Sequence, residues 1–409
     1  MHNLKLSKIA CFFNILLIFS IIFDPTNLFK VKDISFVLFV LLNIGNASFK
    51  HVLIPLTFLA TYFSSTIVGV LLSIPTDQAT SLNILKSYLF LIYLFWMHRE
   101  DLKEIKYFYI ATKIMALITI FLFFTMSYFN KYEVLFYTFI HYTLKDTIMI
   151  ARRVFYGIPT MMIFFRTSPL MAISLAMSLS LFYTRHKSRY FFDSIIFMVA
   201  LIASGTRANM LTGMLLFFIV SLFYIYYYKK QVFIFATCSL LFIYAAFFVI
   251  FLLLTVKEES TAVKGGHLIS YMNLFDKNPL LYLLIGGGPG SLFYTSGFDS
   301  IVPMTELTYL DLIKNYGFIQ AIILIGIFCL PFIGIINSGF LSNLEKFSLS
   351  FGWLGYLFIA GTNPLLISST GFIAFAIAVY ITKHPYYIEL FDKQKMRKSY
   401  IKRLLKYAS

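Results

Sequence analysis

Charged residues are scarce in this chain. Only 13% of its 409 residues are charged and 59% are hydrophobic, whereas a soluble domain carries roughly 25% charged residues. The mean hydropathy is +0.81, and long apolar runs such as Ile114–Phe124 recur. About 20 apolar residues in a helix cross the hydrocarbon core of a bilayer. The composition therefore excludes a soluble globule and predicts an α-helical membrane protein, and the runs lack the alternation of a β-barrel.

Cysteine is nearly absent. The three cysteines, Cys11, Cys238 and Cys329, all lie inside apolar runs, so neither a disulfide framework nor a thiolate metal site is expected. No His, Asp and Glu residues have the spacing of metal ligands. We therefore predict no metal and no cofactor.

Acidic residues are few as well: 18 stand against 34 basic ones, for a net charge of +16. The cations are dispersed over many loops, which argues against nucleic acid as a partner. They suit anionic lipid headgroups instead.

The apolar runs predict a single all-α membrane domain over residues 1–409, a polytopic bundle of about twelve transmembrane helices. The first is expected to be an uncleaved helix, because no small-residue cleavage site follows it. The expected spans are 9–23, 33–46, 52–74, 82–98, 107–127, 170–184, 190–206, 208–228, 231–256, 308–336, 347–363 and 371–382.

Basic residues predict the orientation of these spans. With both termini in the cytoplasm, most lysines and arginines of the short loops fall inside, and only Lys30, Lys32 and Arg207 lie in short outside loops. This bias is the positive-inside rule. The basic tail, 383–409, is either an amphipathic helix on the membrane surface or a disordered segment.

Two long loops, 128–169 and 257–307, are placed outside, in the periplasm. Both are rich in aromatic and aliphatic residues, so we expect them to pack against the bundle. Loops of this length in a compact protein are commonly functional.

Arginines gather at the outer face. Arg152, Arg153 and Arg166 lie in the first long loop, and Arg207 lies in a tight Gly-Thr-Arg turn between two spans. A guanidinium is suited to phosphate oxygens, so these four residues predict a diphosphate site. Snorkelling at the membrane interface or pairing with carboxylates is the alternative.

The second long loop ends in further candidates. Glu306 and Tyr309, together with Lys314, are expected to cluster at the outer end of the tenth span if the segment is helical. Glu306 is then a candidate general base; alternatively, it pairs with a cation and holds the loop.

A glycine-rich run and a histidine precede Glu306. Gly288 and Gly290 belong to the run Ile285–Ser291, which permits positive φ and close backbone approach to a ligand, or forms a plain turn. His267 is expected to be either functional or structural, as is His141. The polar turn Gly361–Gly371 either breaks a helix near the site or simply connects two spans.

The order of these features resembles that of the O-antigen polymerases (Wzy) and their relatives, the O-antigen ligases. The Gly-Thr-Arg turn is followed by a large outer loop with Asn278-Pro279, a glycine-rich turn, and Asn315-Tyr316-Gly317 in the next span. The late Gly361-Thr362-Asn363-Pro364 turn is also similar to that of the polymerases. The resemblance covers about residues 200–320 and 361–371.

The resemblance implies a glycosyltransferase of lipopolysaccharide biosynthesis in the bacterial inner membrane. It moves a growing glycan from undecaprenyl diphosphate to a sugar hydroxyl of a new repeat unit on the same carrier. Arginines 152, 153, 166 and 207 would hold the diphosphate, and Glu306 and Tyr309 would be catalytic. A chain-length regulator of the Wzz type and a flippase are the implied protein partners.

Two other functions are compatible with the sequence. An O-antigen ligase would transfer the glycan to lipid A–core, but ligases place a histidine where this chain has Glu306, which favours a polymerase. A flippase or secondary transporter commonly has two repeated halves. No such repeat is evident here, and the polar residues concentrate at the outer face rather than in mid-span.

Overall fold

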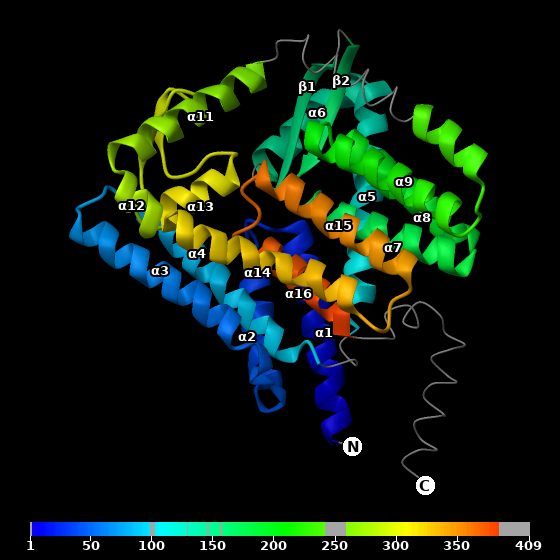
Figure 1. Ribbon diagram of the computed structural model, residues 1–409, viewed down its shortest axis with the longest axis horizontal. Coiled ribbons are helices and arrows are strands. Elements are labelled where there is room, and N and C mark those ends of the chain that lie inside the picture. The colour runs from blue at the N-terminus through cyan, green and yellow to red at the C-terminus, as the bar shows by residue number, and fades with distance from the viewer. Residues whose placement is uncertain are drawn as a thin grey trace.

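The computed structural model describes residues 2–98, 103–128, 130–144, 147–155, 158–241 and 259–383, and these residues are mostly helical (Figure 1). A further apolar helix, Val232–Leu241, follows α9. The α-helices are α1 (His2–Phe23), α2 (Val31–Asn43), α3 (Leu53–Leu71), α4 (Gln78–Leu89), α5 (Glu104–Tyr128), α6 (Asn130–Thr143), α7 (Leu170–Arg185), α8 (Ser188–Ala203), α9 (Arg207–Tyr227), α11 (Glu259–Lys277), α12 (Pro279–Leu284), α13 (Thr308–Tyr316), α14 (Phe318–Asn337), α15 (Asn343–Gly361) and α16 (Ser369–Lys383).

Short 3₁₀ helices and two small sheets complete the described structure. The 3₁₀ helices are η1 (Ile44–Asn46), η2 (Phe49–His51) and η3 (Phe90–Trp96), and the antiparallel hairpins are β1 (Ile148–Phe155) with β2 (Ile158–Phe165), and β3 (Phe293–Thr295) with β4 (Ser300–Val302).

The prediction of a helical bundle is confirmed for the described residues, and its apolar helices are compatible with a membrane protein. A helix occupies each of the twelve expected ranges as far as the chain is described, although 242–258, in the ninth range and just beyond it, lies outside the described residues. Within the part of the chain that the structure describes, five helices are long and apolar enough to cross a membrane: Leu53–Leu71, Gln78–Trp96, Glu104–Tyr128, Arg207–Tyr227 and Phe318–Asn337. The number of twelve crossings stays a prediction, and most of the basic tail, 384–409, is outside the described residues.

The two long outer segments differ from the loops expected. The first contains α6 and the β1–β2 hairpin, whose register pairs Ile148 with Phe165; the second contains α11, α12 and the β3–β4 hairpin. The all-α class is therefore correct for the bundle but not for its outer end. An isolated two-stranded hairpin is only marginally stable and depends on packing against other elements. Local sequence patterns do not reveal such packing, so the hairpins were not predicted.

Two short helices form the centre of the bundle. Every residue of α7 from Leu170 to Leu181 is buried, and so is α16 from Phe372 to Ile381. Small residues allow close approach to α7: Gly352 of α15 lies against Ala176, and the Ser348 hydroxyl donates to the Ala176 carbonyl at 2.7 Å. Small residues and interhelical hydrogen bonds of this kind stabilise helix packing in membranes.

The tenth expected span, 308–336, is not one helix. It breaks at Gly317, where φ is +76° and the amide donates to the Ile313 carbonyl at 2.8 Å, ending α13. Glycine adopts this positive φ without the penalty of a Cβ. The apolar helix α14 is therefore separate from the polar helix α13, which lies at the outer end.

The loops that the positive-inside rule places on the same side of the membrane contact one another in the structure. In Figure 1 the first helix begins at the lower side of the view, and the β1–β2 hairpin lies at the upper side. Hydrogen bonds between the outer connections join Thr26 with Thr147, Asp77 with Gly290, Asn209 with Ser168, and Thr308 with Asn363. Those between the inner connections and the helix ends beside them join Ser48 with Phe95, Tyr227 with Asn343, and Ser338 with Thr382.

Candidate functional site

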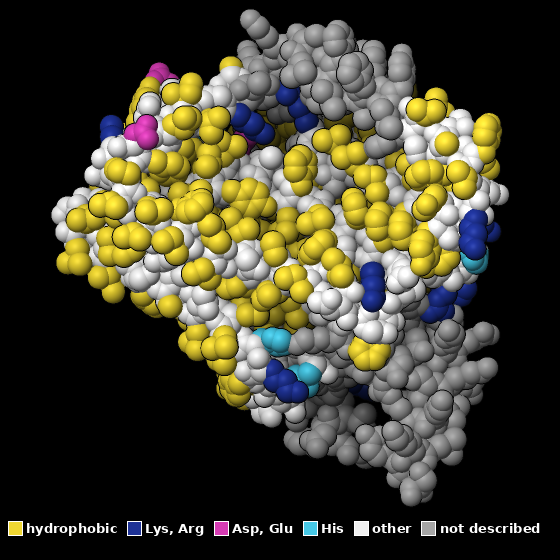
Figure 2. All heavy atoms as spheres, in the orientation of Figure 1, with side chains coloured by type: hydrophobic (Ala, Val, Ile, Leu, Met, Phe, Trp, Pro, Cys, Tyr) yellow, Lys and Arg dark blue, Asp and Glu magenta, His cyan; other side chains and the backbone are white. Residues whose placement is uncertain are grey.

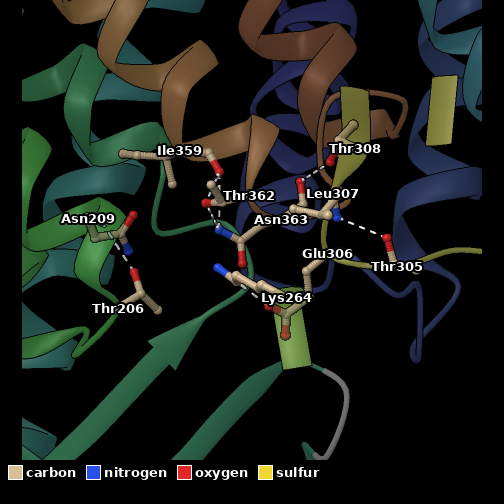
Figure 3. Close-up of polar contacts among 10 residues, drawn as sticks. All are labelled: Thr206, Asn209, Lys264, Thr305, Glu306, Leu307, Thr308, Ile359, Thr362 and Asn363. Carbon is tan, nitrogen blue, oxygen red and sulfur yellow. Dashed lines mark hydrogen bonds and ion pairs between the residues drawn. The ribbon is translucent and has the colours of Figure 1, made fainter. Parts of the chain in front are cut away.

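A hollow lies at the end of the bundle that carries the β1–β2 hairpin, which the positive-inside rule places outside. Figure 2 shows lysine and arginine side chains at its rim, near the top of the view, with an acidic side chain beside them. The elements around it are α11, the start of α9, the end of α15 and the segment before α13 (Figures 1 and 3). These are the regions that carry the predicted site residues.

Glu306 lies on the segment that leads into α13. The helix begins only at Thr308, so the carboxylate is not part of it. The Glu306 side chain is 48% exposed, and its Oε2 lies 3.7 Å from the Lys264 ammonium of α11 (Figure 3). The pairing with a cation, which was the alternative to a general base, is thus present, and about half of the Glu306 side chain is still exposed.

Arg207 is the first residue of α9. Thr206 caps this helix by accepting a hydrogen bond from the Asn209 amide at 3.4 Å, and the Asn209 side chain donates to Ser168 at 2.8 Å. Gly205, with φ +70°, lets the turn lie against β2. The cap places Arg207 at the outer end of α9, where the helix dipole also favours anions.

The other three arginines lie on or beside the β1–β2 hairpin. Arg166 is exposed directly after β2, and its backbone amide donates to the Thr147 carbonyl at 3.1 Å. Arg152 lies on β1, and Arg153 pairs with Thr160 in the register, but its side chain is outside the described residues. Arg152 opens onto a cleft of about 430 Å³ lined otherwise by Val134, Tyr137, Ile150, Ala151 and Met161.

The Asn363 turn is bound to the segment that carries Glu306. The Thr308 hydroxyl is within hydrogen-bond distance of the carbonyls of Ala360 and Asn363, at 2.8 and 2.7 Å. The Asn363 amide group donates to the Ile359 carbonyl at 3.1 Å, at the end of α15 (Figure 3). This polar turn therefore borders the hollow, as one of the two sequence alternatives proposed.

The expected cluster of Glu306, Tyr309 and Lys314 is not formed. The Tyr309 hydroxyl donates to the Leu357 carbonyl at 2.8 Å, which ties α13 to α15. Lys314 is buried, and its ammonium donates to the carbonyls of Ser291 and Pro303, each at 2.6 Å. Because Glu306 precedes the helix, the helical spacing assumed from the sequence does not apply to it.

His267 is fully buried on α11. Its Nδ1 lies 2.6 Å from the Thr295 hydroxyl, and its Nε2 has no hydrogen-bond partner among the described residues. Burial lowers the pKa of His267. The Lys264 ammonium lowers this pKa further, whereas the Glu306 carboxylate raises it in part. The neutral imidazole supports the β3–β4 hairpin. The side chain of His141 lies outside the described residues.

The glycine-rich turn approaches protein backbone closely. Gly288 (φ +91°) faces the Ser65 carbonyl of α3, and Gly290 (φ +78°) faces the Asp77 carbonyl at the start of α4. The Gly287 and Gly288 amides donate to the carbonyls of Lys314 and Asn315, at 2.8 and 3.0 Å. The turn thus joins α3 and α4 to the α13–α14 break, and these two amides are used within the protein.

Gly286→Ala is expected to destabilise this joint. A Cβ at Gly286, where φ is +80°, would overlap the backbone of Tyr316 and Gly317. Left-handed strain and overpacking together cost roughly 2–4 kcal/mol. We expect a lower melting temperature in detergent and a lower yield. Gly326→Ala on α14 is the control, because open space surrounds that position; equal melting temperatures for the two variants would contradict the prediction.

Several residues that support Glu306 were not predicted from the sequence. Lys264 contacts the carboxylate, and Tyr271, Thr305 and Asp311 form hydrogen bonds beneath it. The spacing of Lys264, His267 and Tyr271 puts them on one face of a helix, and this was the available signal. Within the described ranges, no three His, Cys, Asp or Glu residues are placed to hold a metal ion.

Comparisons with protein-family models, with curated proteins and with solved structures find no match for this chain.

Proposed function

We propose that this chain is a polysaccharide polymerase of the O-antigen polymerase type, acting at the outer face of the bacterial inner membrane. One observation supports this best: Glu306, the Arg207 end of α9 and the Asn363 turn border a single hollow at one end of an apolar bundle. In this proposal both termini are cytoplasmic, so the hollow opens toward the periplasm and the outer leaflet.

The chemistry follows from these groups. The acceptor sugar hydroxyl attacks the anomeric carbon of the donor glycan, and its proton passes to the Glu306 carboxylate. The bond from that carbon to the diphosphate oxygen breaks, and undecaprenyl diphosphate leaves with the electron pair. A positioned base and cations that stabilise the leaving charge each lower the barrier.

The four arginines lie on or beside two different structural elements, helix α9 and the β1–β2 hairpin. Arg207 sits at a helix N-terminus, whereas Arg152, Arg153 and Arg166 come from the hairpin or its end. Guanidinium groups from two directions would neutralise both phosphates of the leaving group. The apolar cleft beside Arg152 would take part of the isoprenoid chain. Such a substrate needs an apolar and a cationic surface together.

Deleting the gene tests the class of function. Loss of a polymerase should leave single repeat units on the surface lipid, seen as one band in place of a ladder on a gel. Loss of a ligase would leave no surface glycan, and loss of a flippase would leave repeats stranded inside; either result would contradict the proposal. Complementation with the intact gene is the control for the deletion. In a separate assay in vitro, the purified protein should form polymer from a carrier-linked repeat without other proteins.

A further inference from the structure

One face of α11 contacts strand β3, the segment that carries Glu306 and the first turn of α13. Lys264 pairs with the Glu306 carboxylate, and His267 contacts Thr295. The Tyr271 hydroxyl lies 3.0 Å from the Thr305 hydroxyl and donates to Asp311 at 2.5 Å. Lys264, His267 and Tyr271 are three and four positions apart, so they lie on one face of α11. This face contacts both the Glu306 carboxylate and Thr305, the residue that precedes Glu306 in the chain.

Thr305 lies at the centre of this contact. Its amide donates to Asp311 Oδ2 at 2.9 Å, and its hydroxyl accepts the Leu307 amide at 3.1 Å (Figure 3). Thr305 is 3% exposed and Asp311 is 6% exposed. The hydrogen bond that holds Thr305 is therefore buried and the one that holds Leu307 is partly buried, while the Glu306 side chain itself remains about half exposed.

The state of Tyr271 suits this role. Burial, together with the Asp311 carboxylate, raises the pKa of Tyr271 well above its ordinary value. The hydroxyl therefore keeps its proton and donates to Asp311. Satisfied hydrogen bonds in a buried network are strong and rigid, because few competing water molecules reach them.

We infer that Thr305, Asp311 and Tyr271 are positioning residues for Glu306, which hold the backbone of 305–307 so that the carboxylate meets the acceptor hydroxyl. The inference rests on the proposed function. A base on a loop needs such support, because a general base must lie within hydrogen-bond reach of its proton, and small misplacements cost rate. Loops position functional groups less well than helices do.

Thr305→Val and Thr305→Ser form the matched test, measured as polymerisation by the purified full-length protein with carrier-linked repeat. The valine variant loses the hydroxyl that accepts from Leu307, whereas serine keeps it. We expect kcat to fall about tenfold in Thr305→Val, with KM within about twofold because the substrate contacts are kept. The serine variant should stay within about twofold of wild type in both constants.

A double-mutant cycle separates positioning from general stability. If Thr305 acts through Glu306, Thr305→Val should cost little further activity in the Glu306→Gln protein, assayed with enzyme in excess. The same tenfold loss in both backgrounds would overturn the inference. If Thr305→Val does not fold, Tyr271→Phe replaces it, since that change removes one hydroxyl and keeps the ring contact with Phe293.

Failure of the two proposals can be distinguished. If the wild-type protein forms no polymer, or Glu306→Gln retains full activity, the proposed function or the base is wrong whatever the cycle shows. If Glu306→Gln is impaired and the cycle is additive, only the positioning role is wrong.

Discussion

Replacing Arg207 with alanine is expected to abolish polymer while the protein stays in the membrane. The residue opens α9 at the outer end, behind the Thr206 cap, and the cap does not depend on the arginine side chain. In the proposed reaction Arg207 stabilises the charge on the departing diphosphate. Loss of one such preorganised donor costs about 10²–10³ in kcat. Arg207→Lys should recover part of the activity, because the charge remains but the planar fork is lost.

The measurement is the ladder of chain lengths in cells, together with polymerisation in vitro. Arg189→Ala is the matched control, since Arg189 lies in the first turn of α8, at the opposite end of the α8–α9 pair, against Tyr190. It should leave the ladder intact. A normal ladder in Arg207→Ala would remove the diphosphate role from this residue, and absence of the variant from the membrane would show a structural role instead.

Glu306→Gln is expected to reduce polymerisation by about 10²–10³, within the range that general base catalysis contributes. The amide has nearly the same shape as the carboxylate but cannot take the acceptor proton. Because the wild-type side chain is 48% exposed and its ion pair with Lys264 is long, at 3.7 Å, loss of the charge should cost little stability. Glu306→Asp should keep some activity, since the base is retained about one methylene further back.

Asp299→Asn provides the matched control for this change. Asp299 lies in the same outer segment and has a φ of +49°, which asparagine tolerates. It accepts a hydrogen bond from Tyr294 at the surface, so its loss should not alter the rate. Full activity in Glu306→Gln would rule out a general base at this position, and an equal loss in both variants would point to an effect on the outer segment as a whole.

Much of the helical part of the fold was predictable. Runs of apolar residues predicted ranges that helices occupy in the described structure, because a spanning helix satisfies its own backbone hydrogen bonds and needs only a local apolar stretch. The break at Gly317 was not predicted, since it depends on the close packing of Gly286 against that backbone. Likewise the β1–β2 hairpin depends on its support by the bundle.

The candidate site divides in the same way. Composition and local pattern alone determined that this chain has apolar helices of membrane-spanning length and that its polar residues gather in a few connections. Only the tertiary structure decided that Glu306 faces Lys264, that Tyr309 is tied to α15, and that Lys314 is buried beneath the β3–β4 hairpin. The physical reason is distance along the chain: these contacts join segments whose approach is set by packing and turn geometry rather than by the residues next to them.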